Sequence, residues 1–257
     1  METTIEVQGV SVPAVGLGTW ELTGRACVEA VGDALALGYR HIDTARAYRN
    51  EREVGEAIRA SGVAREEIFL VTKIPRSDAH ADRVRAACEA SLADLGVDHV
   101  DLLLLHWPAP HVPLAETLGA MAALGDEGRA ARIGVSNFPP PLLQKALELA
   151  PVINDQVELN PYRPQDELVA LASRRDVFVT AYSPLARGRV ARDSVLQEIG
   201  AAHGKTAGQV ALRWALGHGR TCVIPKASTH ERRVENLDVF DFELGEDERA
   251  RIDALGR

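Results

Sequence analysis

Short apolar runs alternate with longer segments of helical periodicity along the whole of this 257-residue chain. There are eight such runs, at residues 15–17, 41–43, 68–72, 100–105, 133–136, 153–157, 177–182 and 222–224. Several are apolar at successive positions, as residues 102–105 are, rather than at every second position. Continuous apolar strands are typical of a parallel sheet that is covered on both faces. The alternation therefore predicts strands and helices in regular succession.

The intervening segments carry small and apolar residues at helical spacing. One such face consists of Val84, Ala87, Cys88, Ser91, Leu92 and Leu95. A second consists of Ala207, Val210, Ala211, Trp214 and Ala215, in which we expect the tryptophan to be a packing residue. Gly96 is expected to end the first helix, because glycine readily adopts left-handed backbone. The prolines at 139–141 predict a turn that leads into a further helix.

Eight strands that alternate with helices predict a (β/α)8 TIM barrel. We expect a single domain over residues 1–257, because barrels of this class often form one domain at this length. An open doubly wound sheet is the alternative. Residues 7–10, before the first barrel strand, have the pattern of a tight turn. They predict an N-terminal β-hairpin across the bottom of the barrel.

Charge and cysteine content exclude several classes of protein. With 29 basic and 37 acidic residues, the net charge is −8, whereas general nucleic-acid binding requires a basic surface. A small basic pocket for one phosphate is still allowed. Cys27, Cys88 and Cys222 are far apart and odd in number, which argues against a disulfide framework or a zinc ribbon. Because the sequence has neither signal-peptide features nor a bilayer-length apolar run, we expect a cytoplasmic protein without a membrane partner.

Four titratable side chains follow three consecutive apolar runs. Asp43 ends the second run, Tyr48 lies five residues further on, and Lys73 and His106 follow the third and fourth runs. Any one of these residues at a strand end is more often structural than functional. In a TIM barrel, however, functional side chains lie at the carboxyl ends of the strands, where these four would meet.

This set of side chains is suited to proton transfer to a carbonyl oxygen. Tyrosine titrates near pH 10, but a neighbouring Lys73 ammonium would lower the pKa of Tyr48. Asp43 would supply the counter-charge that a buried lysine needs, and His106 could orient the carbonyl by a hydrogen bond. Because protein side chains do not supply a hydride, the chemistry needs a bound hydride donor.

A basic island near the C terminus indicates a phosphate site. Lys226, Ser228 and Arg232 lie near the start of a predicted helix, which would suit a phosphate group. A solvated, salt-bridged helix face would explain the same charges. The chain has neither the Gly-x-Gly-x-x-Gly fingerprint nor a Walker A motif, so a dinucleotide would not be bound in the Rossmann manner.

Together, these motifs resemble those of the aldo-keto reductase family along nearly the full chain. The matching segments are residues 38–45 with Tyr48, Glu51 and residues 54–55, then Lys73, residues 105–108, residues 134–138, and residues 224–226 with Arg232, Glu235 and Asn236. The chain is similar to the compact bacterial members, which include 2,5-diketo-gluconate reductases. The resemblance implies a monomeric barrel that uses NADPH, and no metal, to reduce aldehydes or ketones to alcohols.

The resemblance also implies a role for each site residue. Tyr48 would be the general acid, Lys73, paired with Asp43, would lower its pKa, and His106 would orient the carbonyl. The cofactor residues would be Ser136, Asn137 and Gln156 on the nicotinamide carboxamide, Tyr182 on the nicotinamide ring, Ser183 and Leu185 along the pyrophosphate, Lys226, Ser228 and Arg232 on the 2′-phosphate, and Glu235 and Asn236 at the adenine. Trp20 and Trp107 would line the substrate pocket, although core packing competes for Trp20.

Three departures from the family pattern bear on these expectations. Ala227 stands where the family usually has a serine or threonine on the phosphate, so we expect a softened preference for NADPH over NADH. Ala131 and Arg132 replace the usual order, in which a basic residue lies two positions before Ile133, and we expect little consequence. The chain ends at Arg257 without a further pocket loop found in many animal members, which predicts an open and permissive pocket.

Two other functions fit part of the sequence. A non-enzymatic NADPH-binding module would use the same nucleotide site, although all four candidate catalytic residues are present. A metal-dependent barrel hydrolase would use His41, Asp43 and His106 as ligands, but the sequence has no His-x-His motif or close carboxylate cluster. The sequence therefore favours an NADPH-dependent carbonyl reductase.

Overall fold

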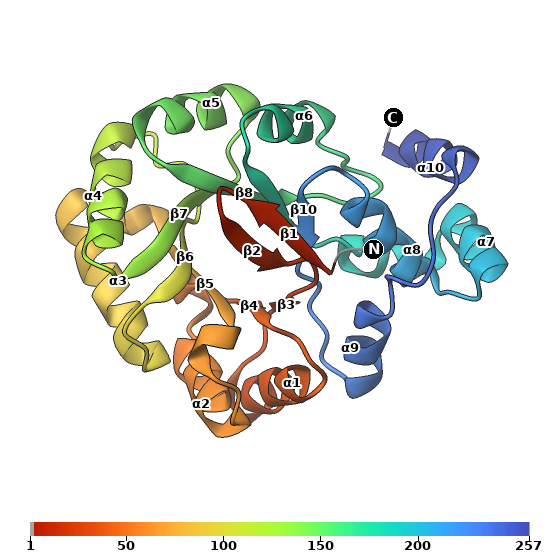
Figure 1. The fold of residues 1–257 in the computed structure, drawn as a ribbon, viewed down its shortest axis with the longest axis horizontal. Helices are drawn as coiled ribbons and strands as arrows, with labels where there is room; N and C mark the ends of the chain where they lie inside the picture. Colours follow the sequence, from red (N-terminus) through yellow and green to blue (C-terminus); the bar gives the residue numbers. More distant parts are fainter. Residues whose placement is uncertain (1–2, 257) are drawn as a thin grey trace.

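Eight parallel strands form one closed sheet in the computed structural model, which describes residues 3–256. Their order is β10-β9-β8-β7-β6-β5-β4-β3, with bounds β3 Leu17–Gly18, β4 His41–Asp43, β5 Phe69–Ile74, β6 Val100–Leu105, β7 Ala130–Ser136, β8 Val152–Glu158, β9 Phe178–Tyr182 and β10 Thr221–Val223. The two ends of the sheet meet, because Val15 forms a parallel bridge with Val223 and the Gly16 amide donates to the Val223 carbonyl over 2.8 Å. The predicted barrel is confirmed, and the open sheet is wrong (Figure 1).

Helices surround the barrel, as Figure 1 shows. The α-helices are α1 Gly24–Ala36, α2 Glu51–Ser61, α3 Ala81–Leu95, α4 Leu114–Asp126, α5 Pro140–Leu149, α6 Asp166–Arg174, α7 Ser194–His203, α8 Ala207–Leu216, α9 His230–Leu237 and α10 Glu246–Asp253. Short 3₁₀ helices occupy Arg46–Tyr48, Arg65–Glu67, Arg76–Asp78, Ala186–Gly188, Val190–Arg192 and Ala254–Gly256. Within residues 3–256, no helix is long and apolar enough to cross a membrane.

Local sequence signals placed several element boundaries correctly. Gly96 follows α3 with a positive φ of 68°, and Pro140 begins α5. Trp214 lies in the core at 2% exposure. The first strand differs from its apolar run, because residue 15 makes only an isolated bridge while Leu17 and Gly18 pair with β4. Strand bounds follow the pairing of neighbours, which hydrophobicity alone does not specify.

The N-terminal hairpin closes the bottom of the barrel. β1 (Thr4–Val7) pairs with β2 (Val10–Pro13) in antiparallel register, and Gln8 and Gly9 make the turn with φ of 45° and 75°. Val7 and Val12 pack into the apolar barrel interior with Phe69 and other strand residues. The hairpin lies in front of the barrel strands in Figure 1, which confirms its predicted place. The hairpin therefore covers the amino ends of the barrel strands.

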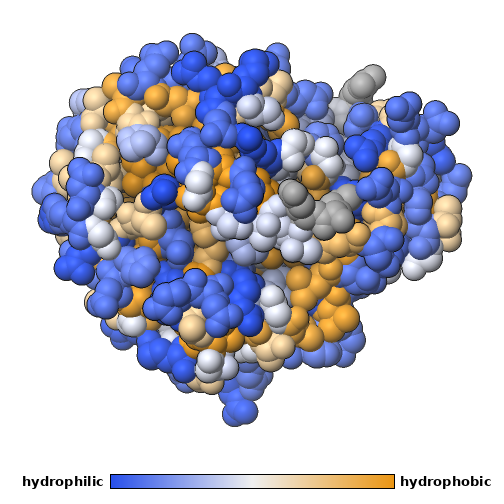
Figure 2. Space-filling view, viewed as in Figure 1, coloured by the Kyte–Doolittle hydropathy of each residue, from blue (hydrophilic) through white to orange (hydrophobic). Residues whose placement is uncertain are grey.

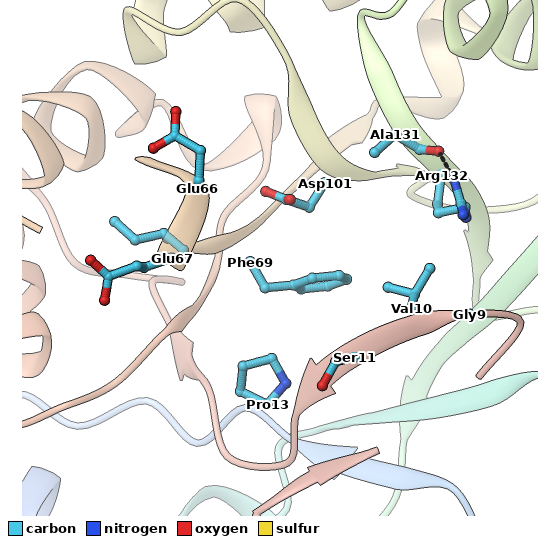
Figure 3. A pocket seen from close by; sticks show the side chains of 11 residues that line it. Gly9, Val10, Ser11, Pro13, Glu66, Glu67, Phe69, Asp101, Ala131 and Arg132 are labelled. Atoms are coloured by element: carbon cyan, nitrogen blue, oxygen red, sulfur yellow. Dashed lines mark hydrogen bonds between the residues drawn. The ribbon is translucent and has the colours of Figure 1, made fainter. Parts of the chain in front are cut away.

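A pocket of about 470 Å³ lies beside this hairpin, at the bottom of the barrel. Figure 3 shows Phe69 between Val10 and the starts of the neighbouring strands, with Asp101 and Arg132 at its edge. The outer edge of this face of the molecule carries mainly hydrophilic side chains (Figure 2). Because none of the four candidate proton-transfer residues lines this pocket, it is separate from the site described next.

Candidate functional site

The barrel brings the four predicted proton-transfer residues together. Asp43 ends β4, Lys73 lies near the end of β5, and His106 directly follows β6. Tyr48 reaches the same place because the 3₁₀ helix Arg46–Tyr48 follows β4 and ends at Arg49, which has a left-handed φ of 59°. The carboxyl ends of the parallel strands all lie at one end of the barrel, so residues far apart in the sequence meet there.

Lys73 is a fully buried cation with a complete set of partners. Its side chain is 0% exposed and that of Asp43 is 2% exposed. Its Nζ donates to Asp43 Oδ1 over 2.5 Å, to the Thr44 carbonyl over 2.7 Å and to Tyr48 Oη over 3.4 Å. Burial by itself lowers the pKa of Lys73, but the charge of Asp43 and the hydrogen bonds to Asp43 and Tyr48 outweigh it, so the pKa is raised. The lysine is therefore charged.

Burial dominates the ionisation of Tyr48. It raises the pKa of Tyr48 above the usual value, while the Lys73 ammonium lowers it by a smaller amount. The influence of Lys73 has the sign that the sequence predicted, but the net shift is in the opposite direction because the partial burial of the phenol outweighs it. Since Tyr48 Oη accepts from Lys73, the hydroxyl proton is left for another acceptor.

His106 lies beside Tyr48 as a neutral imidazole. The two rings meet edge to face with their centroids 5.6 Å apart. Burial first, and the Lys73 charge second, lower the pKa of His106 to about 3. The ring can therefore donate a hydrogen bond at neutral pH without acting as a competing acid.

A second group of polar side chains continues from the ends of β7, β8 and β9. The Ser136 hydroxyl donates to the Gln156 carbonyl over 2.8 Å, and the Asn137 amide donates to Ser136 Oγ over 3.0 Å. Tyr182 Oη donates to Asn137 Oδ1 over 2.8 Å. Gln156 Nε2 donates to Asp43 Oδ2 over 2.7 Å, which joins this group to the buried ion pair. That contact could not be predicted from the sequence alone.

Of the predicted phosphate residues, Lys226 and Ser228 lie on the loop after β10, and Arg232 lies in the first turn of α9. Lys226, Ser228 and Arg232 are all exposed. Lys226 is not free, because its Nζ lies 3.4 Å from Glu21 Oε2. Ala227 is 1% exposed and its carbonyl accepts from Arg233 Nη1 over 2.9 Å. Its side chain therefore packs in the core.

The other predicted cofactor residues follow β9 or lie in α9. Ser183 and Leu185 follow β9, where Ser183 has a positive φ of 46°. Glu235 Oε1 accepts from the Thr206 hydroxyl over 2.5 Å, and Asn236 is 4% exposed. The structure thus brings these residues to the same end of the barrel, with Asn236 largely covered.

Two exposed tryptophans belong to loops at the carboxyl ends of the strands. Trp20 is 42% exposed and Trp107 is 45% exposed, so Trp20 is not a core residue. The guanidinium of Arg187, from the loop after β9, lies 5.5 Å from the centroid of the Trp20 ring. Such exposed aromatic faces are available to a ligand.

Two residues that shape these loops were not predicted from the sequence. Asn50 is 0% exposed and donates to the carbonyls of Thr19 and Leu22, which holds the loop that carries Trp20. Arg233 is 6% exposed and pairs with Asp33 over 2.6 Å. Helical spacing was a usable signal for Arg233, because it lies one turn from Asn236, which is also buried.

Metal-ligating side chains do not gather at this site. Among residues 3–256, no three His, Cys, Asp or Glu side chains are placed so that they could hold a metal ion.

Comparison with known proteins gives close similarities over nearly the whole chain. The sequence profile of the Aldo/keto reductase family matches residues 14–257. An aldo-keto reductase of Mycolicibacterium smegmatis is 48% identical over 240 residues, or 92% of this chain and 86% of that protein. The glyoxal reductase of Bacillus subtilis is 40% identical over 253 residues, or 97% and 91% of the two chains. A crystal structure provisionally named 2,5-diketo-D-gluconic acid reductase B matches at TM-score 0.97 and 41% identity, covering 100% of this chain and 92% of that one.

Proposed function

Because this chain belongs to the aldo/keto reductase family, we propose that it is an NADPH-dependent oxidoreductase that reduces aldehydes and ketones to alcohols. The observation that supports the proposal most directly is the buried Lys73 ammonium, which contacts both Asp43 and the Tyr48 hydroxyl. A buried lysine held charged beside a phenol is a costly arrangement that stabilises the phenolate left by proton donation.

In the proposed reaction, Tyr48 donates its hydroxyl proton to the carbonyl oxygen of the substrate. Lys73 stabilises the phenolate that remains, and Asp43 keeps the lysine charged. His106, whose pKa is about 3, donates a hydrogen bond to the carbonyl and orients it. When bound, NADPH supplies the hydride that the carbonyl carbon accepts.

The residues at the mouth of the barrel fit NADPH. Ser136, Asn137 and Gln156 present the hydroxyl and amide groups that a carboxamide requires, because these groups both donate and accept. Tyr182 presents an aromatic ring at the end of β9 for the nicotinamide. Ser183 and Leu185 would border the pyrophosphate, and Glu235 and Asn236 would adjoin the adenine.

The 2′-phosphate of NADPH would bind the exposed cations Lys226 and Arg232 together with Ser228. Ala227 offers no hydroxyl to this phosphate and is buried. We therefore propose that the preference for NADPH over NADH is weaker than in relatives with a hydroxyl at this position.

The substrate is proposed to be a small aldehyde or ketone, including sugar-derived and dicarbonyl compounds. The exposed Trp20 and Trp107 would form apolar walls of an open pocket. The similar proteins named glyoxal reductase and 2,5-diketo-D-gluconic acid reductase B supply the first compounds to try. We further propose that the protein acts as a monomer, which light scattering tests.

Oxidation of NADPH by the purified protein tests the proposal, with a panel of glyoxal, 2,5-diketo-D-gluconate and simple aldehydes and ketones. Tyr48→Phe should lower turnover by about 10²-fold or more, because general acid catalysis contributes about that much, and should still bind NADPH. Tyr162→Phe is the matched control, since Tyr162 donates to Asp193 away from Lys73. Full activity in Tyr48→Phe would contradict the mechanism. Tight NADPH binding without turnover of any compound would instead favour a non-enzymatic module, and a metal required for activity would favour a hydrolase.

A further inference from the structure

The side-chain amide of Gln156 contacts the buried ion pair directly. Gln156 is 2% exposed, and its Nε2 donates to Asp43 Oδ2 over 2.7 Å. A carboxylate only accepts hydrogen bonds, so the NH2 end of the amide must face Asp43. The other carboxylate oxygen of Asp43 accepts from Lys73. Both oxygens of this buried group therefore have a partner, and Gln156 is one of the two.

A bulge in β8 gives Gln156 its register. Along β7 the partners advance by two residues, from Ile133 to Val135, while along β8 they advance by three, from Val152 to Asp155. Ser136 then pairs with Gln156. Because a slip of one residue turns each side chain to the opposite face of a sheet, the extra residue in β8 determines that Gln156 faces the barrel interior.

Gln156 also forms one end of a second network. Its main-chain carbonyl oxygen accepts from the Ser136 hydroxyl over 2.8 Å and from the main-chain N–H of Asn137 over 2.9 Å. Asn137 accepts in turn from Tyr182. The Gln156 side chain is thus bonded to the Asp43–Lys73 pair, while its main-chain carbonyl is linked through Ser136 and the Asn137 side chain to Tyr182.

We propose that Gln156 is a positioning residue that couples the nicotinamide end of the cofactor site to the Asp43–Lys73 pair, an inference that rests on the proposed function. Nε2 remains on Asp43 while Oε1 accepts from the cofactor carboxamide, because an amide carries a separate donor and acceptor. A glutamine that contacted only the carboxamide would have no effect on the ion pair. The coupling role and a role limited to the carboxamide therefore predict different effects of a Gln156 substitution on the stability of the cofactor-free protein.

Thermal unfolding of the cofactor-free protein between pH 5 and 9 tests this coupling, with Gln156→Glu and the neutral Gln156→Met as a matched pair. Gln156→Glu would put two carboxyl groups in contact, where both cannot ionise, so one pKa would be raised in the folded state. A folded-state pKa above the unfolded value of about 4.3 stabilises only at low pH, and that stabilisation is lost as pH rises. The Tm of Gln156→Glu should therefore fall relative to Gln156→Met as pH rises.

The expected fall is about 3–5 °C for each unit by which the pKa is raised. In an Asp43→Asn background this fall in Tm should be smaller by at least about half, because the effects of substitutions at two contacting residues are not additive. A Tm difference that does not change with pH, or that is the same in the Asp43→Asn background, would overturn the proposal. These measurements use neither substrate nor cofactor, so they test the link between Gln156 and Asp43 even if the protein proves not to be a reductase.

Kinetics separates the coupling from a role limited to the carboxamide. We expect kcat of Gln156→Glu to decrease over the same pH range, whereas the kcat profile of Gln156→Met should parallel that of the unsubstituted protein at a lower level. If both variants raise only the Kd for NADPH and leave the pH profile of kcat unchanged, Gln156 contacts the cofactor alone and the proposal is wrong.

Discussion

Lys73→Met is the substitution that most directly probes the buried ion pair. It would leave the Asp43 carboxylate, whose side chain is 2% exposed, with Gln156 as its remaining side-chain partner. Removing one member of a buried pair costs about 3–5 kcal/mol, because the other charge stays buried without compensation. At about 2–4 °C per kcal/mol for a chain of this size, the Tm should fall by about 6–20 °C. Reductase turnover should be lost as well.

The double variant Asp43→Asn/Lys73→Met makes this reasoning refutable. It removes both charges, so it should be more stable than Lys73→Met by about 1 kcal/mol or more, although it carries one more substitution. Urea unfolding with linear extrapolation gives the free energies of unfolding to compare. Arg251→Met is the control, because it breaks the exposed pair with Glu198 and should scarcely move the midpoint. A double variant less stable than Lys73→Met would refute the argument from uncompensated charge.

Three further predictions follow from other parts of the structure. Glu21→Gln should tighten NADPH binding by about two- to five-fold and leave NADH binding unchanged, because it removes an exposed carboxylate that competes with the 2′-phosphate for Lys226. Equal changes in the Kd of both cofactors in fluorescence titrations would contradict this. Val12→Ala should lower stability by about 1–3 kcal/mol in urea unfolding and leave the KM for NADPH unchanged, because it opens a cavity in the hairpin at the closed end of the barrel. The pKa of His106 is about 3 in the folded protein and about 6.5 in the unfolded chain, so the free energy of unfolding should decline as pH falls below 6.5. His106→Gln should flatten that decline, and identical pH profiles for the variant and the unsubstituted protein would argue against a neutral His106 ring.

Much of the fold could be predicted from residues near one another in the chain. The alternation of apolar runs with helical periodicity indicated the barrel, and the turn at Gln8 and Gly9 indicated the hairpin. The strand ends also indicated Asp43, Tyr48, Lys73 and His106 as one cluster, because parallel strands bring their carboxyl ends to one edge. Each of these inferences uses only spacing along the sequence and the geometry of a regular sheet.

Other properties depend on atoms that the sequence does not place. The net shift in the pKa of Tyr48 is upward because burial outweighs Lys73. Asn236, within α9, is covered, while Lys226 on the preceding loop is exposed and paired with Glu21. Desolvation and pairing of this kind are set by distant segments that pack around each group.

Gln156 illustrates the division most clearly. It lies within the apolar run at residues 153–157, and the resemblance implied a partner in the cofactor. That its amide donates to Asp43, 113 positions away, follows from a bulge in β8 and from closure of the barrel. Periodicity in a sequence reports which face of an element a residue occupies, because that face is a local property of the backbone. Which group meets it across a barrel is decided only when every strand has its register, since a shift of one residue would turn the same side chain away.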